Sequence, residues 1–165
     1  MKIFAALLLC LPLAAYAEWG DFDREFDQDK PWAEVAVKLP PYPKDENLIS
    51  FNVSPATRNA YFVDAKSISV GADNVVRYTV VVKAAGGALN VSFEGMRCDT
   101  AERRLYAYGH PDGTWSKARD GGWERIKLRS QLSYRKALYE DHFCHDGLIV
   151  KDSREAVQNL RRAAR

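Results

Sequence analysis

The densest set of ligand-forming side chains is the segment EDHFCHD, residues 140–146. His142 and His145 are three residues apart, which on a helix places both imidazoles on one face. With Asp146 they form a two-histidine, one-carboxylate set that zinc accepts. No second ligand cluster lies nearby in sequence, and the common metal and cofactor signatures are absent. We therefore expect an exposed helix end here, with neither metal nor cofactor, and keep these three side chains as the candidates for a metal site.

Cys144, in the same segment, has a second possible chemistry as one half of a disulfide with Cys98. The third cysteine, Cys10, lies in the N-terminal apolar run. If export removes that run, the two remaining thiols enter an oxidising compartment, where such pairs persist as disulfides. Closing so long a loop stabilises the fold by roughly 3–4 kcal/mol. The alternative is a pair of free or metal-bound thiols.

The N-terminus has the pattern of a cleaved signal peptide. Lys2 precedes an apolar run over residues 3–15, and Ala15 and Ala17 place small side chains where a signal peptidase reads the chain. The run is shorter than the ~20 residues of a spanning helix, although a membrane anchor remains the alternative. We predict cleavage after Ala17, a periplasmic or otherwise exported protein, and no transmembrane span in the mature chain.

Composition limits the partners. The chain has 24 basic and 22 acidic residues, for a formal net charge of +2. Such a balance gives no reason to invoke nucleic acid or an anionic membrane as the main partner. The sequence does not indicate an oligomeric state. Its length fits one domain of ordinary size, large enough to bury a core.

Residues 18–47 form an acidic and proline-rich N-terminal arm. The segment DFDREFDQD, residues 21–29, resembles a row of calcium ligands. An EF-hand loop needs glycine at its sixth position, where Phe26 stands if the loop begins at Asp21. We therefore expect a solvated arm ahead of a single domain over residues 48–165. Its possible anchors onto that domain are Trp19, Phe22, Phe26 and Trp32.

Aromatic and basic side chains alternate between residues 103 and 123. Rings interleaved with cations can stack on sugars or bases, although aromatic side chains also dominate protein cores. Strict alternation along RRLYAYG predicts Leu105 and Ala107 on one face of a strand, with Tyr106 and Tyr108 on the other. The candidate binding surface consists of Arg103, Arg104, Tyr106, Tyr108, Trp115 and Trp123.

A hydrolytic site has little support in the sequence. His110 precedes Pro-Asp-Gly, which is typical of a solvated turn. No nucleophile-elbow, phosphate-loop or His-Glu-x-x-His motif is present. No catalytic residue is therefore predicted.

The order of elements predicts an α+β fold. From residue 48 the chain alternates apolar and polar residues in short runs, and residues 75–84 and 88–97 flank Ala-Gly-Gly-Ala as a hairpin. Residues 130–143 and the segment from Asp152 onward have helical spacing, with Glu155 completing a capping box. We predict an antiparallel sheet of about five to seven strands, with C-terminal helices packed on one face or end.

Several of these segments together resemble one family. They are KPWAEV, LPPYP, FVDAKSISV with VVRYTVVV, GMRCDT with RLYAYG, and GGWERI. Over roughly residues 20–147 the chain is similar to the cryptic neisserial protein-like family, small exported proteins of Gram-negative bacteria. The resemblance implies an envelope location and no assigned activity, so it supplies no catalytic residues.

Two functions follow as hypotheses. The first is an exported cell-envelope protein of unknown activity, a non-enzymatic binding or assembly module whose partner is an envelope protein or a glycan. The alternative is a small periplasmic hydrolase or metal-dependent enzyme that uses His142 and His145.

Overall fold

The computed structural model describes residues 31–119 and 121–163. The predicted signal peptide, the acidic segment 21–29 and three of the expected anchors, Trp19, Phe22 and Phe26, lie outside the described residues. Trp32–Arg165 form one compact unit. In the described part of the chain, no helix combines the length and apolar character needed to cross a bilayer.

The main element is an antiparallel sheet that combines long and short strands. Its strand order is β1-β2-β4-β5-β6-β7, with β3 paired to β4 and β8 paired to β6. Its strands are β1 (Leu48–Phe51), β2 (Ala60–Asp64), β3 (Ser69–Val70), β4 (Val75–Lys83), β5 (Leu89–Arg97), β6 (Glu102–Gly109), β7 (Trp115–Lys117) and β8 (Glu124–Arg125). Two more strands, β9 (Cys144–His145) and β10 (Leu148–Ile149), form a separate hairpin. The predicted α+β class is confirmed.

The strand number is higher than predicted. The described residues hold eight strands in the main sheet, against an expectation of five to seven. The difference comes from β3, β7 and β8, which are two or three residues long. A strand so short contains too little alternation to stand out from a turn.

The hairpin β4–β5 forms where the sequence predicted it. All nine residues of β4 pair with β5, from Val75 opposite Arg97 to Lys83 opposite Leu89. The turn closes with a hydrogen bond from the Ala84 amide to the Ala88 carbonyl, and Gly87 has φ 89°. That left-handed backbone is easily reached only by a residue without Cβ, which explains the glycine at position 87.

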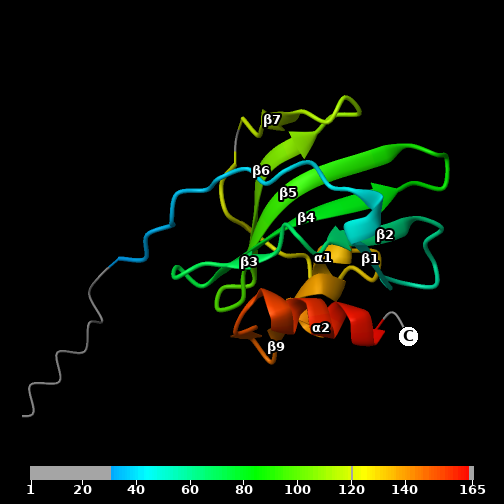
Figure 1. The fold of residues 1–165 in the computed structure, drawn as a ribbon. Coiled ribbons are helices and arrows are strands. Elements are labelled where there is room, and N and C mark those ends of the chain that lie inside the picture. The colour runs from blue at the N-terminus through cyan, green and yellow to red at the C-terminus, as the bar shows by residue number, and fades with distance from the viewer. Residues whose placement is uncertain (1–30, 120, 164–165) are drawn as a thin grey trace, which may run out of the picture. The chain divides into compact units, whose positions relative to one another are not determined.

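The helices cover one half of one sheet face. They are α1 (Tyr134–Ala137), the π-helix η2 (Leu138–Phe143) and α2 (Ser153–Ala163), preceded early in the chain by a 3₁₀ turn η1 (Asp45–Asn47). Figure 1 shows α1 and α2 beneath β1, β2 and β4, away from β6 and β7. The rings of Tyr78 and Phe143 meet at 5.1 Å inside this layer. The C-terminal helices therefore pack on one face, as predicted.

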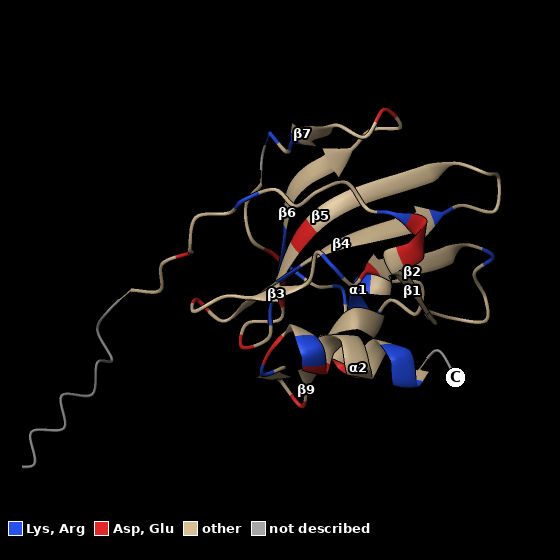
Figure 2. Ribbon diagram, viewed as in Figure 1, with Lys and Arg blue, Asp and Glu red and all other residues tan. Residues whose placement is uncertain are grey.

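Helix α2 begins at the predicted capping box. The Glu155 amide donates to Asp152 Oδ1 at 3.0 Å, and the Lys151 amide donates to the Glu155 carboxylate at 2.6 Å. Ala156 and Leu160 are fully buried on its inner face, whereas basic segments lie toward both ends of the helix (Figure 2). The other predicted helix is shorter than residues 130–143, because the Ser133 side chain caps it by accepting from the Lys136 amide.

The disulfide between Cys98 and Cys144 is present. It joins the end of β5 to the start of β9 across a sequence separation of 46. Cys98 is 3% exposed and Cys144 is 1% exposed. The bond therefore lies inside the core, where it ties the helical segment to the sheet.

Residues 32–43, which we call the strap, cross the opposite face of the sheet. They form neither helix nor strand, and prolines at 40, 41 and 43 remove amide donors that a strand would need in the last part of the strap. The Trp32 indole instead donates to the Asp73 carbonyl at 2.8 Å, and the Trp115 indole donates to the Pro40 carbonyl at 3.0 Å. In Figure 1 the strap is the blue-to-cyan segment that runs across the sheet.

Candidate functional site: the two faces of strand β6

A β-bulge in β6 divides the predicted binding surface between two faces. Phe93 pairs with Ala107 but Glu94 pairs with Leu105, so Tyr106 is an extra residue in the ladder. The side-chain alternation is therefore reset within the strand. Leu105 and Tyr108 lie on the face that carries the helices, and Tyr106 lies on the strap face. The predicted pairing of Tyr106 with Tyr108 on a common face is wrong.

The strap covers four of the six predicted surface residues. The Tyr106 hydroxyl donates to Glu34 Oε1 at 2.5 Å. Arg104 forms an ion pair with the same carboxylate, and the Trp123 indole donates to it at 3.4 Å. Burial raises the pKa of the Tyr106 phenol, and the hydrogen bond to Glu34 raises it further. Trp115 belongs to the same covered face, because its indole donates to the Pro40 carbonyl of the strap.

A second carboxylate, that of Asp73, also holds the strap against the sheet. Asp73 forms a 2.5 Å ion pair with Arg77 and accepts from the Val35 amide at 2.8 Å. Burial alone would raise the pKa of Asp73, but the hydrogen bonds from Arg77 and Val35 hold that pKa below its ordinary value. Arg77 also lies 3.7 Å from Glu34. Each acidic group on this face thus has its cations inside the chain.

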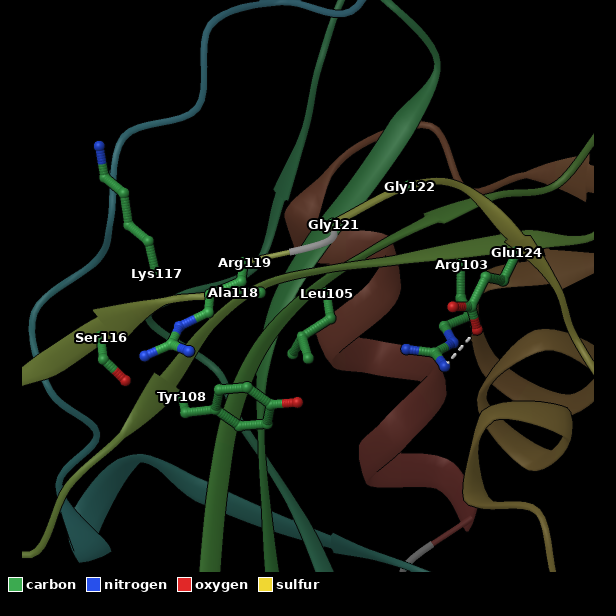
Figure 3. A pocket seen from close by; sticks show the side chains of 10 residues that line it. All are labelled: Arg103, Leu105, Tyr108, Ser116, Lys117, Ala118, Arg119, Gly121, Gly122 and Glu124. Atoms are coloured by element: carbon green, nitrogen blue, oxygen red, sulfur yellow. Dashed lines mark hydrogen bonds and ion pairs between the residues drawn. The ribbon is translucent and has the colours of Figure 1, made fainter.

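The other face of β6 is open. Its side chains Arg103, Leu105 and Tyr108 lie between two depressions of about 480 and 470 Å³, which we call the β6 groove. Figure 3 shows Leu105 and Tyr108 projecting from β6, with Arg103 directed at Glu124. Tyr108 is 51% exposed. The helices pack over β1, β2 and β4 and reach Glu94 of β5 through Tyr134 and Arg135, and the groove lies beyond them over β6.

The first depression of the β6 groove lies toward β7 and is mainly polar. Arg103 forms a 2.6 Å ion pair with Glu124. Arg119 is exposed beside Tyr108 and Ser116. The lining therefore offers one ring, cations and hydroxyl groups to a ligand.

A buried carboxylate forms one wall of the second depression. Glu94, the one acidic residue of β5 (Figure 2), is fully buried and accepts from Arg135 Nε at 2.8 Å and Nη2 at 2.7 Å. The Tyr134 hydroxyl donates to it at 2.7 Å and the Ser92 hydroxyl at 2.9 Å. Burial and then the Glu94 charge raise the pKa of Tyr134. With its donors in place, this carboxylate holds Arg135 in position.

The candidate metal ligands are not brought together. His142 is 3% exposed and packs edge-on against the Phe51 ring at 5.8 Å. His145, on β9, is exposed and lies 3.5 Å from Asp146. Burial lowers the pKa of His142, with Asp141 acting in the opposite direction. Across residues 31–119 and 121–163, no three histidine, cysteine or acidic side chains are grouped as a metal would require.

His110 lies in the predicted turn. The Gly113 amide donates to the His110 carbonyl at 2.9 Å, and Gly113 has φ 83°. The ring nitrogen Nε2 of His110 lies 2.9 Å from the Ser116 hydroxyl in an exposed position. The geometry supplies no buried carboxylate to orient this histidine.

Comparison with known proteins places the chain in a family. Residues 27–161 match the model of the CNP1-like family. The chain belongs to the CNP1-like family. No curated protein and no solved structure matches it. The family match spans the strap, the sheet, the β6 groove and nearly all of α2, and it is a family of uncharacterised proteins.

Sequence reasoning missed the residues that organise both faces. Glu94 could have been found, because an acidic residue in the middle of a predicted central strand indicates a buried partner. Arg135 is then its natural complement. Glu34 gave no signal, since its partner Arg104 is 70 positions away in sequence.

Proposed function

We propose that the protein is an exported, non-enzymatic binding module of the cell envelope and that the β6 groove binds a glycan. One observation carries the proposal. The Tyr108 ring is 51% exposed beside Leu105, on a sheet face that the chain's own helices leave uncovered. Tyr108 shares the second depression with Leu89, which is 50% exposed, and exposed apolar side chains gathered on one surface mark interaction sites.

The chemistry of the groove favours a sugar polymer. An exposed aromatic ring can stack on a sugar ring as it does on a base. Arg119 and Ser116 add donors beside Tyr108. Protein interfaces concentrate several large apolar side chains at their centre, whereas the depression toward β7 has Tyr108 as its one ring among mainly polar and basic groups. The shape, two open depressions along one strand, suits an extended chain.

Export is supported by the sequence and by the disulfide. The N-terminal pattern predicts a signal peptide cleaved after Ala17. The Cys98–Cys144 bond belongs with an oxidising compartment such as the periplasm. Both arguments favour an envelope ligand over a cytosolic one.

The test is co-sedimentation with purified cell-wall glycan. We expect wild type to sediment, Tyr108→Ala to lose at least about tenfold in affinity, since stacking contributes about 1–3 kcal/mol, and Tyr108→Phe to retain the ring and the binding. Leu132→Ala, which removes an exposed apolar side chain outside the groove lining, is the matched control. A wild type that stays in the supernatant, or a Tyr108→Ala protein that sediments normally, would overturn the proposal.

A further inference from the structure

A small basic pocket lies at the end of the β6 groove, where Arg103 meets Glu124. It has a volume of about 190 Å³. Its basic lining residues are Arg103, Arg125, Lys127 and Arg135. The pocket also contains the hydroxyl-bearing residues Ser130 and Ser133, and Arg103 and Arg135 connect it to the groove.

The charge of this pocket is not balanced by its own lining. Glu124 is the one acidic residue among the lining residues, and it is engaged with Arg103 at 2.6 Å. Glu94, behind the lining, is engaged with Arg135, so the exposed Arg125 and Lys127 carry the surplus positive charge. That surplus attracts anions, so the pocket is suited to an anionic group.

Arg135 is already oriented for such a group. Its Nε and Nη2 atoms both donate to the fully buried Glu94, at 2.8 and 2.7 Å. The guanidinium plane is therefore fixed, and Nη1 remains outside this paired contact. A ligand that approaches from the pocket meets a cation whose side chain loses little further freedom on binding.

We propose that this pocket binds a phosphate group. Four basic residues and two hydroxyls surround the small space, more donors than the two oxygens of a carboxylate can accept, whereas a phosphate has three or four acceptor oxygens and up to two charges. The proposal deepens the proposed function, because a phosphorylated glycan in the groove would place its phosphate here.

The first experiment uses inorganic phosphate and the whole exported chain, followed by amide chemical-shift titration. We expect saturable shifts at residues 124–135 that acetate does not produce. Arg125→Gln with Lys127→Gln, at positions that line this pocket and neither depression of the groove, should weaken phosphate binding about tenfold, the effect of a 1.4 kcal/mol loss. Glu124→Gln should strengthen it, because the competing carboxylate is removed.

Arg119→Gln is the matched control, since Arg119 lines the groove and is absent from the pocket lining. It should leave phosphate binding unchanged while weakening glycan sedimentation. Absence of phosphate shifts, equal shifts with acetate, or an unaltered Arg125→Gln, Lys127→Gln protein would overturn the phosphate site even if the glycan sediments. If only the glycan sedimentation fails, the glycan proposal is wrong, and the phosphate titration still decides whether the pocket binds phosphate.

Two ligands distinguish a phosphate carried by a sugar from a phosphate carried by a lipid. Glucosamine 1-phosphate presents the group on a soluble sugar, and phosphatidylcholine vesicles containing phosphatidic acid present it on a lipid. We expect the sugar phosphate to bind more tightly than inorganic phosphate, with the gain abolished by Tyr108→Ala. Binding to the vesicles but not to the sugar phosphate would assign the pocket to a lipid headgroup and overturn the link to the groove.

Discussion

Each face of β6 carries a tyrosine, but the ring on one face is covered by the strap and the ring on the other is exposed. On the strap face Tyr106 and Arg104 contact Glu34, so ring and cation are satisfied within the chain. On the other face Tyr108 is exposed, and the exposed Arg119, which follows β7, lies in the same depression. Residue type therefore does not mark the binding surface here. What distinguishes the faces is a single bulge residue and a strap that covers one of them.

The largest expected effect on the free energy of unfolding distinguishes Arg135, which contacts the buried wall of the groove, from Arg119 in its open lining. Arg135→Leu leaves the fully buried Glu94 without its cation, which should lower the free energy of unfolding by about 3–5 kcal/mol. Arg119→Leu, at an exposed position of the same groove, should change it by less than about 0.5 kcal/mol. Urea denaturation of both variants measures the difference; equal midpoints would contradict the assignment of Glu94 and Arg135 as a structural pair.

Removal of the Glu34 carboxylate should loosen the strap from the sheet. Glu34→Ala removes the acceptor shared by Tyr106, Arg104 and Trp123. Charged hydrogen bonds of this kind contribute about 1.5–3 kcal/mol, so we expect a loss of about 2 kcal/mol and a red shift of tryptophan fluorescence as the strap loosens. Glu46→Ala, an exposed acidic residue of η1, is the control and should behave as wild type.

Acid should also act on the strap face. The pKa of Asp73 is lowered in the folded protein, so the unfolded state binds the proton more tightly than the folded state. The contribution of Asp73 is therefore complete above its ordinary pKa of 3.8 and is lost as the pH falls through the lower folded value. Denaturation of wild type and Asp73→Asn from pH 6 downward should converge in this acidic range, about pH 4 and below; parallel curves would show that Asp73 is not the group concerned.

The smallest effect on stability belongs to the residue that matters most for binding. Tyr108 is half exposed, so Tyr108→Ala should change the free energy of unfolding by less than about 0.5 kcal/mol. Tyr106→Ala, which removes a partly buried ring packed against Phe93 at 5.5 Å, should cost about 3 kcal/mol. Thermal unfolding of the two variants compares the two faces of β6 directly; a large loss in Tyr108→Ala would mean that its ring is part of the core.

Local patterns were sufficient to predict the fold class. The alternation over β4 and β5 and the Gly-containing turn between them involve neighbours in sequence, and the capping box at Asp152 does as well. The disulfide followed from counting cysteines in a chain predicted to be exported. Each of these features depends on residues or rules that a single sequence displays.

The site was predicted only in part. Arg103 and Tyr108 were among the proposed surface residues and do line the groove, whereas Arg135 was not proposed. RRLYAYG fits a perfect two-residue period, so nothing in it reveals the bulge at Tyr106. The contact between Glu34 and Arg104 joins positions 70 apart. Such pairings depend on tertiary packing, which residue spacing does not encode.

The most direct test of the two-face interpretation is a map of ligand-induced amide shifts with soluble, phosphorylated cell-wall glycan fragments. We predict that the largest shifts centre on Leu105, Tyr108 and Arg119, with the strap residues Val35 and Val37 unaffected. Shifts centred on the strap and Tyr106, with none at Tyr108, would show that the ligand displaces the strap and that the binding face is the one we describe as closed.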